Sequence, residues 1–176
     1  VLGSALTAEQ EAALPIFNLH ETFYEVDKAL SNQLRVVMGI LNGGSDALPS
    51  VRVNFGTGIL LSCVGLEQDT FPDKMPWLKE HLSKEQIAKL DKDDLRPAGS
   101  FARGLEWMAT FKDILGDKIP IYCMDTQGPF DLAHLMMGDP IFMEVYDDPP
   151  FVHHLMELCL ELGIRTHWWM KEVSGE

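Results

Sequence analysis

The apolar residues of this chain change their spacing from one segment to the next. Between Leu19 and Leu41 they recur every three or four positions, which predicts one face of a long helix that ends at the glycines after Asn42. Amphipathic helices are also predicted from about Ala98 to Leu115 and from the Asp148-Pro149 pair to about Val173. Helical segments are therefore expected to dominate the chain.

Shorter helices are predicted where capping residues, glycine and proline punctuate the pattern. One begins with a capping box over Thr7–Gln10, and a second covers the apolar run Ile59–Val64. Two more are predicted from Ser83 to Leu90 and from Gly128-Pro129 to Met137. The segment Glu67–Leu82 contains Pro72, Pro76 and Trp77, and its pattern predicts irregular structure.

Two segments have the character of strands. Ser50–Asn54 places Val51 and Val53 on one side, whereas Ile119–Met124 is apolar throughout, which is typical of a strand buried on both faces. Because helical material separates them, parallel βα units are predicted. Two strands leave unpaired edges, so we expect either a larger barrel or a partner that completes the sheet.

Composition and charge narrow the class of protein. The 176 residues are 46% apolar and 23% charged, which is typical of a globular domain. Apolar runs such as Gly58–Val64 are too short for a membrane span, and Val1–Gln10 has no secretory pattern. A net charge of −13 opposes nucleic-acid binding. Three widely spaced cysteines favour reduced thiols, so a cytoplasmic protein without membrane or nucleic-acid partners is expected.

Two loops follow the predicted strands, at the ends where parallel α/β folds bind ligands. In the first loop the candidate ligand-binding residues are Asn54, Gly56, Thr57 and Gly58, because glycine lets the backbone approach a ligand and the polar side chains offer hydrogen bonds. The alternative is a tight turn that simply requires glycine.

In the second loop Asp125 is the candidate catalytic residue, as a base or as the partner of a cationic group. The candidate ligand-binding residues beside it are Thr126, Gln127, Gly128 and Phe130, at the start of a helix whose free N–H groups attract carboxylate or phosphate. The alternative is that Asp125 or Thr126 only caps this helix.

The histidines and cysteines do not have the spacing of a zinc site, so no metal site is predicted from this chain alone. His153 and His154 are adjacent on a helix and point in different directions, and His134, Cys123 and Cys159 lie too irregularly for zinc ligands. Trp168-Trp169 are interpreted as packing residues.

Three segments resemble the uroporphyrinogen decarboxylase superfamily. Ile119–Ala133, which contains Gly128-Pro129-Phe130, resembles that family's strand–loop–helix segment "G-P-[FW]-T-L-A". Tyr146–Met156 resembles its "D-P-E-x-V-H-x-L-L" helix start. Val51–Gly58, followed by Val64–Glu67, resembles its first strand and the "L-G" helix end.

The resemblance implies an α/β fold, a helix-rich partial (β/α)8 TIM barrel. The chain would be a single incomplete domain over 1–176, with a helical lead-in at 1–49, a first βα segment at 50–116 and a second at 117–176. The family includes a decarboxylase of tetrapyrroles, which needs no cofactor, and zinc-dependent methyltransferases that serve corrinoid proteins, coenzyme M or tetrahydrofolate.

Two positions favour the methyltransferase branch. Carried over from the motifs, the decarboxylase's essential aspartate would stand at Gly56 and its active-site tyrosine at Leu135. The resemblance therefore implies corrinoid-linked methyl transfer in one-carbon metabolism, with a small-molecule substrate, the corrinoid as substrate and a corrinoid protein as partner. This chain would bind no cofactor alone, and zinc would come from a C-terminal half.

Two alternatives remain open. One is tetrapyrrole decarboxylation by altered catalytic groups. The other is a non-catalytic binding module or a half-barrel that acts only through a partner chain. A homo-oligomer is one such partnership.

Overall fold

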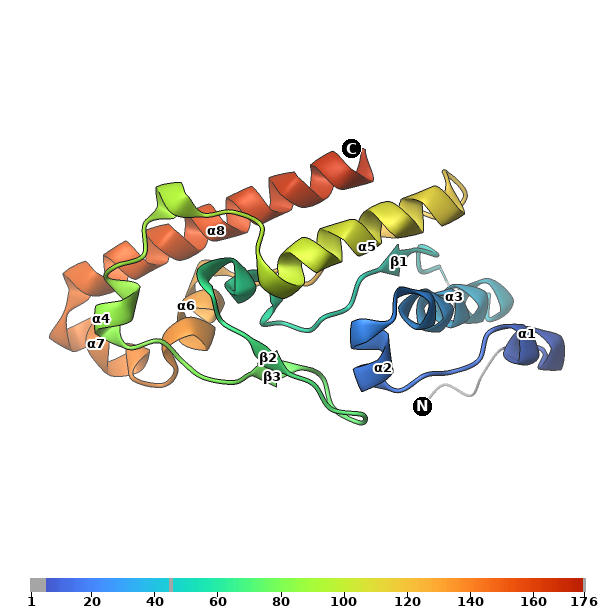
Figure 1. Ribbon diagram of the computed structural model, residues 1–176, viewed down its shortest axis with the longest axis horizontal. Helices are drawn as coiled ribbons and strands as arrows, with labels where there is room; N and C mark the ends of the chain where they lie inside the picture. Colours follow the sequence, from blue (N-terminus) through green and yellow to red (C-terminus); the bar gives the residue numbers. More distant parts are fainter. Residues whose placement is uncertain (1–5, 45, 176) are drawn as a thin grey trace.

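The computed structural model describes residues 6–44 and 46–175 (Figure 1). Three helices begin the chain: α1 (Ala8–Ala13), α2 (Leu19–Tyr24) and α3 (Val26–Asn42). The prediction of one continuous helix from Leu19 is wrong, because Glu25 has extended backbone angles and separates α2 from α3. Lys28 bridges Glu21 and Glu25 across the break, and the turn directs Phe23 into the core.

The two predicted strands form a parallel pair, as the alternation of strands and helices along the chain predicts. In β1 (Val51–Arg52) and β4 (Ile121–Tyr122), Val51 is paired with Ile121 and Arg52 with Tyr122. Over the described residues these strands pair only with each other, and no closed barrel is seen. The prediction that the second strand is buried on both faces is wrong, because Tyr122 is 62% exposed on a strand that has only one neighbour.

The segment between β1 and Gly99 contains an unexpected hairpin. After the short helix η1 (Ile59–Val64), β2 (Gln68–Asp69) and β3 (Trp77–Leu78) pair antiparallel, in the region for which the prolines predicted irregular structure. Two short helices follow, α4 (Lys84–Ile87) and η2 (Lys92–Asp94).

The remaining helices are α5 (Gly99–Leu115), α6 (Pro129–Met137), α7 (Ile141–Asp147) and α8 (Pro149–Ser174). The sequence pattern did not predict α7. Figure 1 shows α8, in red, running alongside α5, in yellow, and these two helices also contact η1. Within the described part of the chain, no helix combines the length and the apolar character needed to cross a bilayer.

The N-terminus of α5 is held by a residue far away in the sequence. Ala98, the N-cap, has no side chain that can accept a hydrogen bond. Instead, the buried Ser62 hydroxyl of η1 accepts the Phe101 N–H at 2.9 Å and lies 3.0 Å from the Ala98 carbonyl oxygen. Because the cap comes from a distant part of the same chain, it holds η1 against α5, and with η1 the end of the loop after β1.

Candidate functional site

The carboxyl ends of β1 and β4 lie side by side because the two strands are parallel neighbours. Arg52 Nη1 lies 3.8 Å from Asp125 Oδ1, so an ion pair joins the two strand ends. Met124, the residue before Asp125, is buried, and its N–H donates to Met170 Sδ of α8 at 3.2 Å. The candidate catalytic Asp125 is therefore partly buried and anchored from both sides.

The loop after β4 is not used to cap the helix that follows it. The N-cap of α6 is Gly128, with Pro129 in the first turn and no side-chain hydrogen bond to the helix end. The alternative that Asp125 or Thr126 only caps α6 is therefore wrong. Their side chains, together with the N–H groups at the start of α6, remain available to a ligand.

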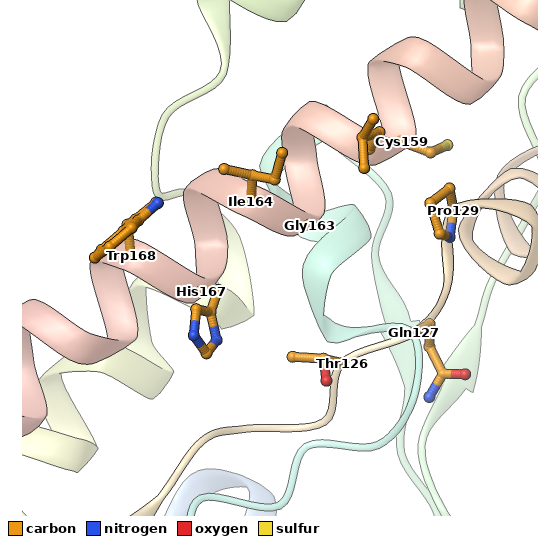
Figure 2. A pocket seen from close by; sticks show the side chains of 9 residues that line it. Thr126, Gln127, Pro129, Cys159, Gly163, Ile164, His167 and Trp168 are labelled. Atoms are coloured by element: carbon orange, nitrogen blue, oxygen red, sulfur yellow. The ribbon is translucent and has the colours of Figure 1, made fainter. Parts of the chain in front are cut away.

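Thr126 and Gln127 line a hollow of about 390 Å³ between this loop and α8. Figure 2 shows His167 extending from α8 toward Thr126, with Pro129 and Cys159 at the other end of the hollow. Leu160, Gly163, Ile164 and Trp168 complete the lining. This surface combines an apolar wall with a few polar groups, which is the usual character of a small-molecule site.

The contribution of α8 was missed by sequence reasoning. Leu160, Ile164 and Trp168 recur every four positions and stand exposed on one side of α8, whereas Leu155, Leu162 and Met170 are buried on another. The packing interpretation holds for Trp169, whose ring lies 6.0 Å from Phe101, but not for Trp168, which is 63% exposed. The sequence feature that could have indicated this wall is the presence of two separate apolar faces on one helix.

The first loop lies beneath the β2–β3 hairpin. Gln68 Nε2 donates to the Phe55 carbonyl oxygen at 2.9 Å, and Gly56 and Gly58 approach Pro76 and Leu78. The close approach that glycine permits is thus made by the hairpin. Thr57 is partly exposed, and Asn54 Oδ1 is buried without a hydrogen-bond partner. A ligand-binding role for Asn54, Gly56, Thr57 and Gly58 stays a prediction.

Replacing Gly56 with alanine is expected to destabilise the protein by about 1–3 kcal/mol, because a side chain is strained in a left-handed backbone conformation. Gly56 has φ +79°, and an added Cβ would lie 3.2 Å from the Pro76 carbonyl oxygen. Gly39→Ala in α3 is the control, because its Cβ would meet nothing within 4 Å. It should stabilise the helix by up to about 1 kcal/mol. Urea unfolding of both variants checks the prediction, and equal shifts would contradict it.

Among the described residues, no three of the His, Cys, Asp and Glu side chains gather as a metal site requires. The three cysteines are thiols. Burial raises the pKa of Cys159 to about 12 and that of Cys63 to about 11, although a hydrogen bond to Ala98 opposes the second shift. Neither thiol is poised as a nucleophile at neutral pH.

Cys63 and Cys159 should therefore resist thiol reagents in the folded protein. At pH 8 we expect both to react about 100-fold or more slowly than a small thiol of ordinary pKa, because the reactive thiolate is scarce and buried. Ellman's reagent, with mass spectrometry to locate the label, measures this rate. In urea all three cysteines should react quickly. Rapid labelling of Cys159 in the native protein would contradict the prediction.

Comparisons with known proteins show the fold alone. No protein family profile matches the chain, and no curated protein matches it. Among solved structures, a methyltransferase from Methanosarcina mazei is similar, with a TM-score of 0.66 and 17% sequence identity. The match covers 94% of this chain and 48% of the methyltransferase, so the chain spans about half the length of that protein. The class that the fold defines is a helix-rich α/β protein similar to a methyltransferase.

Proposed function

We propose that this chain is part of a methyltransferase of the uroporphyrinogen decarboxylase superfamily that acts in corrinoid-linked one-carbon metabolism. The single observation that carries the proposal is the fold likeness to the Methanosarcina mazei methyltransferase over 94% of the chain. The superfamily motifs at Ile119–Ala133 and Tyr146–Met156 support it from the sequence.

The proposal includes an incomplete (β/α)8 barrel. β1 and β4 are parallel neighbours in the described residues, and each is followed by helices, as in successive units of such a barrel. Their other edges are unpaired within the described part of the chain, so further strands would extend the sheet on either side.

The surroundings of two positions argue against decarboxylation. At Gly56 there is no carboxylate to bind pyrrole N–H groups, and leaving such donors unpaired costs about 1–3 kcal/mol each. Leu135 of α6 stands where the decarboxylase has a tyrosine. Its side chain is buried in the hydrophobic core and carries no hydroxyl. Tetrapyrrole decarboxylation is therefore the less favoured activity.

The described residues fit substrate binding better than metal binding. The described residues contain no group of three side chains that could bind zinc. In this proposal the zinc ligands therefore lie outside the described residues. Asp125, Thr126 and Gln127 would orient a polar group of the substrate at the end of β4. The apolar wall of α8 would exclude water from it.

The test is made on the natural full-length product that contains this chain. It is incubated without oxygen with methylcobalamin, zinc and either coenzyme M or tetrahydrofolate, and the corrinoid spectrum and the methylated acceptor are followed. We expect the Co–CH₃ bond to break as the methyl group passes to the thiol sulfur or the folate nitrogen, which loses its proton, while the electron pair of the bond stays on cobalt as cob(I)alamin. A parallel incubation with uroporphyrinogen measures carboxyl loss. Carboxyl loss without methyl transfer would overturn the proposal in favour of the decarboxylase.

One observation favours a second candidate function, a half-barrel that acts only with a partner chain. Tyr122 lies on β4, whose other edge is unpaired within the described part of the chain, and both Tyr122 and the Leu160, Ile164 and Trp168 stripe of α8 are exposed apolar side chains. Light scattering with the natural product separates the candidates. A stable oligomer that requires Trp168 would favour the half-barrel, whereas a monomer with methyl-transfer activity would exclude it.

A further inference from the structure

Arg103 of α5 occupies an environment that the proposed function does not use. Its guanidinium carbon lies over four aromatic rings, at 4.6 Å from the centroid of Phe23, 4.8 Å from Phe55, 5.3 Å from Tyr24 and 5.7 Å from Trp107. These rings come from α2, the loop after β1 and α5 itself. Three separate parts of the chain therefore converge on one cation.

The Arg103 side chain is partly buried, and two of its three nitrogens lack an oxygen partner. Its Nε and Nη2 atoms are buried with no hydrogen-bond partner, and no described carboxylate lies within ion-pair distance of it. Loss of hydration lowers the pKa of Arg103 from its ordinary value. Aromatic faces attract a cation, but they cannot accept its in-plane N–H bonds as an oxygen does.

The other four arginines all have an oxygen partner. Arg35 donates to the Leu14 carbonyl oxygen and Arg96 to that of Leu95. Arg52 pairs with Asp125, and Arg165 with Glu161. Among the described residues Arg103 is in no ion pair, and a longer-range charge attraction links it to Glu106, three positions further along α5.

The rings also show where this cation is closest to solvent. Phe23, Phe55 and Trp107 are buried, whereas Tyr24 is 53% exposed. The Tyr24 hydroxyl oxygen lies 3.5 Å from Thr70 Oγ1, which in turn lies 2.8 Å from His20 Nδ1. The exposed side of Tyr24 therefore carries two further hydrogen-bonding side chains, those of Thr70 and His20.

We propose that Arg103 is an anion-binding residue that takes the carboxylate group of a small molecule entering past Tyr24. A planar guanidinium matches a carboxylate through two parallel N–H···O bonds, and the surrounding rings exclude the water that would weaken them. Phe55 directly follows Asn54 in the first loop, so the bound carboxylate would lie beside that loop. The inference stands on the surroundings of Arg103 and does not require methyl transfer.

The test is an NMR titration of the protein with sodium acetate, against sodium chloride at the same ionic strength. The Nε–H signal of Arg103 and the indole N–H signal of Trp107 are followed. We expect both to shift saturably with acetate in the millimolar range and only slightly with chloride, while the Arg52 signal stays unchanged as an internal control. Equal responses to the two salts would overturn the proposal and leave Arg103 as a packing residue.

Two variants complete the experiment through the Trp107 signal, which each of them retains. Arg103→Met keeps an apolar chain over the rings and should abolish the acetate response. Arg103→Lys keeps the charge without the planar fork and should weaken acetate binding about tenfold. A saturable response that persists in Arg103→Met would overturn the proposal. Should that variant not fold, the Arg103→Lys and wild-type titrations decide the question.

Discussion

Replacing Phe55 with alanine is expected to lower the free energy of unfolding by about 3–5 kcal/mol, because a large buried ring leaves a cavity that the core does not refill. Phe55 is 1% exposed, and its ring centroid lies 4.6 Å from that of Phe23 and 4.9 Å from that of Trp107. It therefore joins α2 and α5 to the loop after β1. Urea unfolding followed by circular dichroism measures the loss.

A surface phenylalanine provides the matched control for this prediction. Phe142 of α7 is half exposed, with its ring 5.9 Å from that of Phe130, so Phe142→Ala should cost less than about 1 kcal/mol. A loss of similar size in both variants would contradict the central place given to Phe55. Phe55→Leu, which keeps most of the apolar volume, should fall between them.

Under the proposed function, Asp125→Asn in the natural product that contains this chain is expected to slow methyl transfer about 100-fold or more, as removal of a proton-transferring or charge-holding group does. The amide has nearly the same shape as the carboxylate, so the hollow beside Thr126 should keep its form. The ion pair with Arg52 is 3.8 Å long and partly exposed, and its loss should change the free energy of unfolding by less than about 1 kcal/mol. Rate measurements and urea unfolding on the same preparation separate the two effects.

Asp139→Asn is the control for the change of charge. Asp139 is an exposed aspartate between α6 and α7, paired with His134 at 3.1 Å, and it does not line the hollow. We expect this variant to keep its methyl-transfer rate. An equal slowing in both variants would indicate an effect of net charge, and an unchanged rate in Asp125→Asn would remove Asp125 from the catalytic residues.

The candidate site could be predicted from the sequence only on its loop side. A polar loop after an apolar strand placed Asp125, Thr126 and Gln127 correctly at the end of β4, because strand ends and helix starts are encoded locally. The opposite wall could not be placed. His167 and Trp168 lie about forty residues further along, and their position depends on how α8 packs against α5 and α6.

The first loop shows the reverse case. Its glycines predict a close approach of the backbone to a ligand, which stays a prediction, and the structure places another part of the chain against them. The neighbour in the structure is a hairpin of two-residue strands, too short to produce an alternating pattern. The same limit applies to Arg103, whose four rings come from 23, 24, 55 and 107 and meet only in the folded chain.

By itself the sequence determined the helices with strong periodicity and clear caps, such as α5 and α8, and the parallel order of the two strands. These features depend on residues a few positions apart, where spacing and capping act directly. Only the tertiary structure decided the break at Glu25, the capping of α5 by Ser62, the exposure of Tyr122 and the hollow against α8. Each of these features depends on which distant segment packs against the residue in question. Packing between segments therefore determines them, and local conformational preference does not.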